Sequence, residues 1–349
     1  MQDLLRRLKK ADGSDLFITA GFPPAIKVDG ESKPVTEQPL TPQQSNTLVR
    51  AIMNDRQTKA FDESKECNFA IAPPNIGRFR VSAFVQQSNV GCVCRTINTE
   101  IPTIEELELP GILKDIVMTK RGLVILVGGT GTGKSTTLAA MVGHRNASSH
   151  GHIITIEDPI EYVHEHRGCV VTQREIGVDT EGWHVALKNT LRQAPDVILI
   201  GEIRTRETMD HAIAFAETGH LCLSTVHANT APTTLDRIIN MFPQAQQRQI
   251  FMDLSHYLNA IVAQRLVIGR DRKRVPAVEV LLNTPHVADL TMKGDVTGVK
   301  EALRESMEAG MQSFDASLYQ LYKDGNIDLE TALANADSAT DLEAKINFG

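Results

Sequence analysis

The stretch GLVILVGGTGTGKSTTLAAM (residues 122–141) most constrains the fold, because it joins an apolar run, a glycine-rich turn and a helical pattern without interruption. Residues 128–135 match G-x-x-x-x-G-K-[ST] in full. Glycines let backbone N–H groups turn inward around phosphates without Cβ clashes, and the following helix directs its positive end at them. A chance match is the alternative, but the flanking strand and helix are the context that this loop requires. We therefore predict a nucleoside triphosphate site.

Two side chains of the loop have distinct expected roles. Lys134 should reach the β- and γ-phosphates, and the hydroxyl of Ser135 should hold Mg²⁺. The sequence contains neither N-K-x-D nor T-K-x-D, which would favour guanine, and no LSGGQ of the transporter ATPases, so adenine is favoured by exclusion. The residues that we expect to bind the nucleotide here are Gly128, Gly129, Thr130, Gly131, Thr132, Gly133, Lys134, Ser135 and Thr136.

Three further apolar, β-branched runs follow the loop, and helical patterns separate them. They are HIITIED, DVILIGE and HLCLSTVH, in residues 152–158, 196–202 and 220–227. Runs of this kind predict a parallel sheet buried on both faces, hence an α/β fold. From about residue 285 onward the pattern is helical.

Acids follow two of these strands, at the sheet edge where ligands of open α/β sheets bind. Glu157, Asp158 and Glu161 follow the first run, and Glu202 follows ILIG. Hydrolysis of a γ-phosphate needs an acid near Mg²⁺ and a group that orients the attacking water, so Glu161 and Glu202 are candidate catalytic residues. Helix capping is the structural alternative for these acids.

Histidines flank the last strand, and arginines lie on two strands nearer the N-terminus. His227 follows that strand at the expected nucleotide edge, and we predict a γ-phosphate contact for it rather than a purely structural role. The spacing of the two histidines, at 220 and 227, matches no common zinc pattern. Arg78 and Arg80 should share a strand face, with Arg95 in the next strand. They matter only if they meet a neighbour's phosphates.

Length and composition predict two domains in a chain of 349 residues. The net charge of −7 argues against broad binding to nucleic acid. Five cysteines without a C-x-x-C predict reduced thiols, and no apolar run approaches the roughly 20 residues that span a bilayer, so we expect no direct membrane insertion. MQDLLRRLKK lacks the apolar centre of a signal peptide, which predicts a cytosolic protein.

The N-terminal part reads as a small α+β domain. A surface helix over residues 3–10 should pack through its leucines, and short strands should follow it. Thr41 and Gln44 form a capping box that should begin one helix running to residue 61. CNFAIA, GRFRVSAFVQ and GCVCRTI then read as strands. We expect domains over residues 1–98, 111–284 and 285–349, with the acidic stretch 99–110 as a linker.

Five segments now follow one another in a recognisable order: the phosphate loop, TIEDPIEYVHE, RQAPDVILIGEIR, AETGHLCLSTVH and GMQSFDASLYQLY. They resemble the secretion ATPase superfamily and, within it, the type IV pilus retraction ATPases of the PilT/PilU kind. The resemblance implies a PAS-like N-terminal domain, a RecA-like ATPase domain and a helical C-terminal part. It also implies a ring of six identical subunits that binds ATP and Mg²⁺ between the two domains.

The resemblance also implies residue roles. Glu161 corresponds to the catalytic glutamate that polarises water, and Glu202 corresponds to the Walker B acid near Mg²⁺. His220 and His227 correspond to the histidine pair of the family. Arg80 and Arg95 lie where the family places arginines that approach the γ-phosphate.

Three departures resemble the PilU branch: HVADLTM at 286–292, RQAP at 192–195, and the tail NADSATDLEAKI. Members of that branch assist retraction and generally depend on a PilT-like ATPase. The implied partners are that ATPase and an inner-membrane platform protein, and the implied location is the cytoplasmic side of the pilus base.

Other function classes remain open from the sequence. A pilus assembly or type II secretion ATPase is one, although we expect a four-cysteine zinc insertion and a longer N-terminal region there. A non-catalytic ATP-binding module should lack Glu161 or Glu202. A nucleic-acid translocase is disfavoured by the net charge.

Overall fold

The computed structural model describes residues 1–28, 30–97, 100–306 and 310–348, which form two compact units. The first comprises Met1–Glu100 with the short segments Ile160–Val163 and Gly177–Asp179, and the second comprises the remainder. Residues 98 and 99, at the boundary expected from the sequence, lie outside the described residues.

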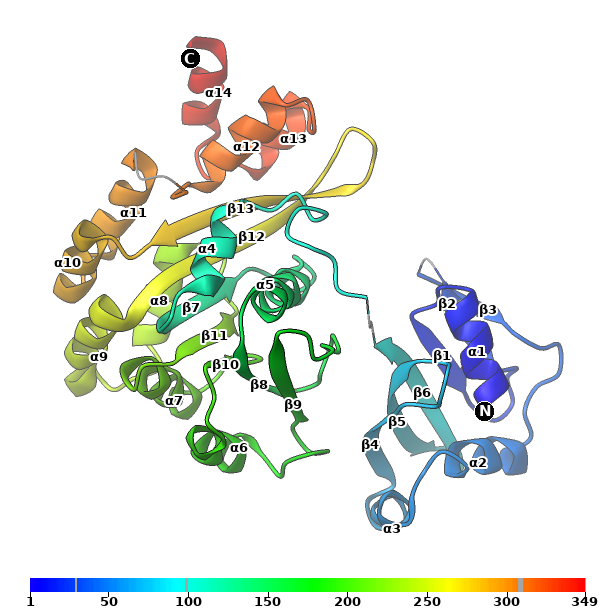
Figure 1. The fold of residues 1–349 in the computed structure, drawn as a ribbon. Coiled ribbons are helices and arrows are strands. Elements are labelled where there is room, and N and C mark those ends of the chain that lie inside the picture. The colour runs from blue at the N-terminus through cyan, green and yellow to red at the C-terminus, as the bar shows by residue number, and fades with distance from the viewer. Residues whose placement is uncertain (29, 98–99, 307–309, 349) are drawn as a thin grey trace. The chain divides into compact units, whose positions relative to one another are not determined.

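The first unit is a six-stranded antiparallel sheet in the order β3-β2-β1-β6-β5-β4 (Figure 1). Its core gathers apolar side chains from the strands and from three helices, including Leu5 and Leu8 of the first helix. The predicted leucine-packed surface helix is therefore confirmed. The elements are α1 (Gln2–Lys10), β1 (Asp15–Ile18), β2 (Ala25–Val28), β3 (Glu31–Pro34), α2 (Pro42–Arg50), α3 (Asp55–Ser64), β4 (Glu66–Ile71), β5 (Arg78–Gln86) and β6 (Asn89–Ile97).

The helix expected from Thr41 to residue 61 is two helices, so that prediction is wrong in its length. The capping box is confirmed, since Thr41 accepts from Gln44 N and the Gln44 side chain accepts from Thr41 N. A second box begins α3, where Asn54 and Gln57 make the same reciprocal pair. Asn54 has extended backbone angles and uses its side chain to cap a new helix, so α2 ends before it.

The second unit contains a seven-stranded sheet in the order β13-β12-β7-β11-β10-β8-β9. All neighbouring strands are parallel except β13, which pairs with β12 as an antiparallel edge strand. The predicted α/β class and the four apolar strands are confirmed, whereas β9, β12 and β13 were not predicted. The strands are β7 (Gly122–Val127), β8 (Gly151–Glu157), β9 (Cys169–Glu175), β10 (Val197–Ile200), β11 (Leu221–Val226), β12 (Leu258–Ile268) and β13 (Arg274–Leu282).

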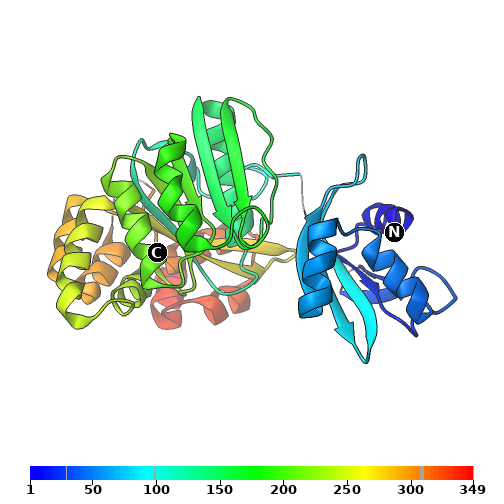
Figure 2. The same cartoon turned by 90° about the horizontal axis from the view of Figure 1, so that it is seen from below.

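Apolar side chains of these strands alternate between two cores. Helices cover both faces of the sheet (Figure 1 and Figure 2). On β7, Leu123 and Ile125 enter the core that α6 to α9 and the C-terminal helices cover, while Val124 and Leu126 enter the core that α4 and α5 cover. The prediction of a sheet buried on both faces is confirmed. The helices are α4 (Ile112–Met118), α5 (Lys134–Ser148), α6 (Trp183–Thr190), η1 (Leu191–Gln193), α7 (Arg206–Glu217), α8 (Ala231–Ile239) and α9 (Gln244–Tyr257).

The stretch read as a linker contributes to the second unit. Ile104 is 2% exposed and Leu109 is buried, and both pack in the core beneath α4 and α5. The sequence gives no sign of this burial, because the two apolar side chains follow neither a helical nor a strand period. Acidic residues also separate them.

The described C-terminal residues after β13 are helical, as predicted. The helices are α10 (Pro285–Lys293), α11 (Val296–Glu305), α12 (Phe314–Lys323), α13 (Leu329–Asn335) and α14 (Ala339–Phe348). Among the described residues, no helix combines the length and apolar character needed to cross a bilayer. All five cysteines are free thiols, and four of them are buried.

Candidate nucleotide site

The glycine-rich turn between β7 and α5 depends on glycine at two positions. Gly128 has φ of 149°, and a Cβ there would lie 2.5 Å from the Gln264 carbonyl oxygen on β12. Gly133, with φ of 89°, is the N-cap of α5, where its left-handed conformation favours glycine. Both glycines belong to the loop that leads into the N-terminus of α5, and the free backbone N–H groups at a helix N-terminus can bind phosphate.

Lys134 is the first residue of α5, and its side chain turns back over the loop. Its ammonium Nζ donates hydrogen bonds to the carbonyl oxygens of Gly128 at 2.9 Å and Gly129 at 2.7 Å. The residue is only 9% exposed, so its cationic group is held against the loop backbone. Ser135, by contrast, is exposed.

The remaining loop residues complete the turn. Thr132 Oγ1 donates to the Gly129 carbonyl oxygen at 3.0 Å, which closes the tip of the loop. Gly129, Thr130 and Gly131 are exposed, and Thr136 points toward a pocket described below. The structure therefore brings all nine predicted loop residues together at the start of one helix.

The ends of the parallel strands set the order of the other groups at this sheet edge. β7 leads into the phosphate loop, and β11, β10 and β8 lie beside it in that order. His227 follows β11, Glu202 follows β10, and Glu157 ends β8. The tertiary structure thus places a histidine and two acids in sequence beside the loop, as the strand pattern predicted.

Glu202 is held by two cationic or polar neighbours. Its Oε2 lies 3.0 Å from His227 Nε2, and its Oε1 pairs with Arg204 Nε. Because a carboxylate only accepts, His227 donates from Nε2, which leaves Nδ1 as an acceptor when the ring is neutral. The sequence predicted Glu202 and His227 as site residues separately, and it did not predict Arg204. The position of Arg204, two residues after Glu202, is the one sequence feature that could have indicated it.

Burial lowers the pKa of His227, and the nearby charges of Lys134, Arg204 and Arg237 lower it further. An imidazole with a lowered pKa stays neutral at pH 7.

Glu157 and Glu161 differ in their surroundings. Glu157 Oε1 accepts from Thr155 Oγ1 at 2.6 Å and from Gln173 Nε2 at 3.2 Å. Glu161 is exposed and lies in the short segment that groups with the first unit. Its catalytic role stays a prediction.

His220 lies at the other edge of the sheet. It precedes β11, and its neighbour Leu221 pairs with Gly122 at the beginning of β7, whereas the phosphate loop follows the end of that strand. Six strand residues separate the two edges, about 20 Å. His220 Nδ1 instead contacts Thr218 Oγ1 at 3.1 Å and the Phe215 carbonyl at 3.3 Å. The geometry does not support its predicted binding to the nucleotide of the same subunit. β7 and β11 are parallel, so the residue before β11 and the loop after β7 lie at opposite edges of the sheet.

Arg80 and Arg95 pair directly across β5 and β6 of the first unit. They share the face opposite to the one on which Phe79 and Val81 enter the core. Arg95 Nε donates to Asp15 Oδ1 at 2.9 Å, whereas Arg80 is half-buried. Like charges directly opposite each other disfavour strand pairing, and here the carboxylate of Asp15 offsets the charge of Arg95. Their approach to a phosphate stays a prediction.

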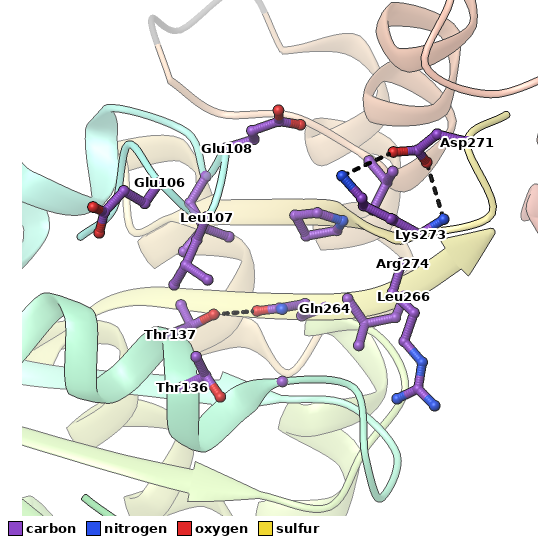
Figure 3. A pocket seen from close by; sticks show the side chains of 14 residues that line it. Glu106, Leu107, Glu108, Thr136, Thr137, Gln264, Leu266, Asp271, Lys273 and Arg274 are labelled. Carbon is purple, nitrogen blue, oxygen red and sulfur yellow. Dashed lines mark hydrogen bonds and ion pairs between the residues drawn. The ribbon is translucent and has the colours of Figure 1, made fainter. Parts of the chain in front are cut away.

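A pocket of about 440 Å³ adjoins the phosphate loop in the second unit (Figure 3). Its walls come from residues 106–109, from the first turn of α5, and from β12 and β13 with the turn between them. Thr137 Oγ1 donates to Gln264 Oε1 at 2.7 Å on one side, and Asp271 pairs with Lys273 on another (Figure 3). Its volume falls in the range of small-molecule sites. No local pattern in the sequence predicts this pocket, because its walls are far apart along the chain.

A phosphate loop at the edge of a parallel α/β sheet, followed by strand-end acids, defines a P-loop nucleoside triphosphatase. The model of the family described as type II/IV secretion system protein matches residues 78–310, and the chain belongs to that family.

Two relatives and one solved structure are similar to this chain over nearly its whole length. The chain is 61% identical over 349 residues to the type IV pilus ATPase PilU of Pseudomonas aeruginosa, covering 100% of this chain and 91% of that protein. It is 41% identical over 334 residues to the type IV pilus retraction ATPase PilT of the same organism, covering 96% and 97%. Among solved structures, the pilus retraction motor PilT with bound ADP matches with a TM-score of 0.91 at 37% identity, covering 98% of each chain.

Proposed function

We propose that this protein is an ATPase motor that drives or assists type IV pilus retraction and twitching motility. The observation that carries the proposal is the set of groups at the carboxyl ends of the strands in the large sheet. There the phosphate loop, His227 and Glu202 follow one another on neighbouring strands. Full-length similarity to PilU and PilT supports the retraction role and does not favour the assembly or secretion alternative.

The nucleotide would bind in two parts. Its phosphates would lie on the loop, where Lys134 would exchange its two carbonyl contacts for phosphate oxygens. Its nucleoside would enter the adjoining pocket, where Leu107 and Leu266 offer apolar contact to a flat base. ADP in the related PilT structure supports an adenine nucleotide.

Mg²⁺ fits the residues present, because this ion prefers hard oxygen ligands and keeps several waters. The exposed hydroxyl of Ser135 and the carboxylate of Glu202 are such ligands, with Glu202 acting directly or through water. When bound, the ion would supply positive charge that offsets the negative charge developing on the phosphates.

The remaining groups would position the reaction. His227 and Arg204 hold the two oxygens of Glu202 and fix the direction of its carboxylate. Glu161 would orient and polarise the attacking water. Arg80 and Arg95 would approach the γ-phosphate from the N-terminal domain and stabilise charge there.

The proposed roles of Glu161, Arg80 and Arg95 depend on the assembly of several chains. We propose a homohexamer of chains that each contain a PAS-like N-terminal domain and a RecA-like ATPase domain. The proposed partners are a PilT-like retraction ATPase and the inner-membrane platform protein of the pilus, with the ring at the cytoplasmic face of the pilus base. Nucleic acid is not a proposed partner.

The test of catalysis is Glu161→Gln in the full chain. Loss of a group that activates water costs about 10²–10⁴-fold in rate, so phosphate release should fall at least about 100-fold while ATP still binds. Glu165→Gln, at an exposed acid four residues further on, is the matched control and should be unaffected. Wild-type turnover in Glu161→Gln would overturn the assignment.

The test of the biological role is genetic. Deletion of this protein, alone and together with a PilT-like relative, should reduce twitching and increase surface piliation in at least one background. Unchanged pilus dynamics in every background would refute the retraction role without affecting the ATPase assignment.

A further inference from the structure

Three side chains with metal-ligating atoms gather on the second unit, outside the nucleotide site. His184 lies in the first turn of α6, and Glu207 and His211 lie four residues apart on α7, which puts them on one face of that helix. Their candidate ligand atoms all lie within 4.8 Å of one another. Across the described ranges, this group is where histidine and acid side chains converge closely enough to hold one ion.

The distances fit a single ion after small side-chain movements. Zn²⁺ lies about 2.0–2.2 Å from histidine nitrogen and carboxylate oxygen, so ligand atoms around a tetrahedral ion are about 3.4 Å apart. His184 Nδ1 and Glu207 Oε1 are 2.5 Å apart, and an ion between them would separate them by about 1 Å. Their side chains are 64% and 53% exposed, so neighbouring atoms leave room for this movement.

We propose that His184, Glu207 and His211 form a site for one divalent transition-metal ion of the zinc class. The two imidazoles and the carboxylate supply three ligands, and water completes the coordination, as in zinc sites that keep an open position. The direct His184–Glu207 contact offers little resistance to the ion, because exposed ion pairs contribute little stability.

The ligand set distinguishes this ion from the Mg²⁺ of the nucleotide. Two imidazole nitrogens favour Zn²⁺, Co²⁺ or Ni²⁺, whereas Mg²⁺ prefers oxygen ligands and its own water. The ligand chemistry of this group therefore differs from that of the Mg²⁺ bound with the nucleotide.

Cobalt is the most informative probe, because its visible absorption reports a tetrahedral site and the nature of its ligands. The full chain, with any purification tag removed, is titrated with Co²⁺ in excess Mg²⁺ and without nucleotide. Zn²⁺ is then added to displace the cobalt. We expect one ion per chain, with visible bands, displacement by Zn²⁺ and no thiolate charge-transfer band.

Single substitutions test the ligands. Loss of a residue that only supports a metal ligand costs about 10–100-fold in metal affinity. Loss of a direct ligand should cost at least as much, so we expect each of His184→Ala, His211→Ala and Glu207→Gln to weaken binding at least about 10-fold. His150→Ala removes another exposed histidine and should leave affinity unchanged. Circular dichroism of each variant distinguishes loss of a ligand from misfolding. Glu207→Gln is the least disruptive of the three changes.

Three results would overturn the proposal. One is cobalt binding that is equally tight in the wild type and in all three ligand variants. Another is a thiolate band, which would place the metal on a cysteine. Absence of any saturable binding by the folded wild-type chain would refute it as well.

Discussion

Removal of the imidazole at position 227 tests whether the histidine acts through Glu202. His227→Ala deletes the Nε2–H donor that lies 3.0 Å from Glu202 Oε2 and leaves the pairing of Arg204 with Oε1 in place. We expect the carboxylate to lose its fixed direction while the phosphate loop still binds nucleotide. The substitution should therefore lower kcat more than it raises KM.

The magnitude follows from the contact. A hydrogen bond to a charged group contributes about 1.5–3 kcal/mol. The Glu202 side chain is 20% exposed and keeps one partner, so we take the lower end, about 1.5–2 kcal/mol. At about 1.4 kcal/mol for each factor of ten, kcat should fall about 10–30-fold.

The assay is steady-state phosphate release by the full chain with MgATP, together with direct binding of a fluorescent nucleotide. His227→Gln is the matched control, because its amide can donate from a similar position and should restore most of the rate. If folded His227→Ala protein keeps kcat within about threefold of the wild type, Glu202 does not depend on this hydrogen bond and the argument fails.

Two predictions concern stability. Burial raises the pKa of Glu279 to about 7 from an ordinary 4.5, so the folded state favours the neutral acid, and the unfolding free energy should decrease as pH rises from about 4.5 through 7. Glu279→Gln keeps an acceptor for the Ala231 N–H and should raise the melting temperature at pH 8, with a gain that disappears near pH 5; equal gains at both pH values would contradict the assignment. Ile104→Ala should lower the unfolding free energy by about 2–4 kcal/mol in denaturant titrations, since this side chain is 2% exposed. The exposed control Glu100→Ala should be near neutral, and an equally neutral Ile104→Ala would show that residues 101–110 act as a linker.

Local patterns carried much of the information about the second unit. Residues 128–135 specify the phosphate loop because its backbone needs glycine at defined positions, and these needs are local. Continuous β-branched runs identify buried parallel strands for the same reason, since burial on both faces leaves no polar position in the strand. Thr41 likewise identified a helix start, although Asn54 was overlooked as a second one.

Other features depended on residues that are distant in sequence. The apolar side chains of residues 101–110 show no period, so only their packing against α4 and α5 reveals that they belong to a core. The pocket beside the phosphate loop joins three separate parts of the chain, and no local pattern marks its walls.

By itself, the sequence determined the class of the main sheet, the phosphate loop and the strand-end acid and histidine, because each depends on a short run of residues. Only the tertiary structure decided which groups meet. The strand order puts His227 against Glu202 and the parallel direction of β11 keeps His220 at the opposite edge. Two histidines seven positions apart thus received different surroundings, because a strand separates its two ends by its full length.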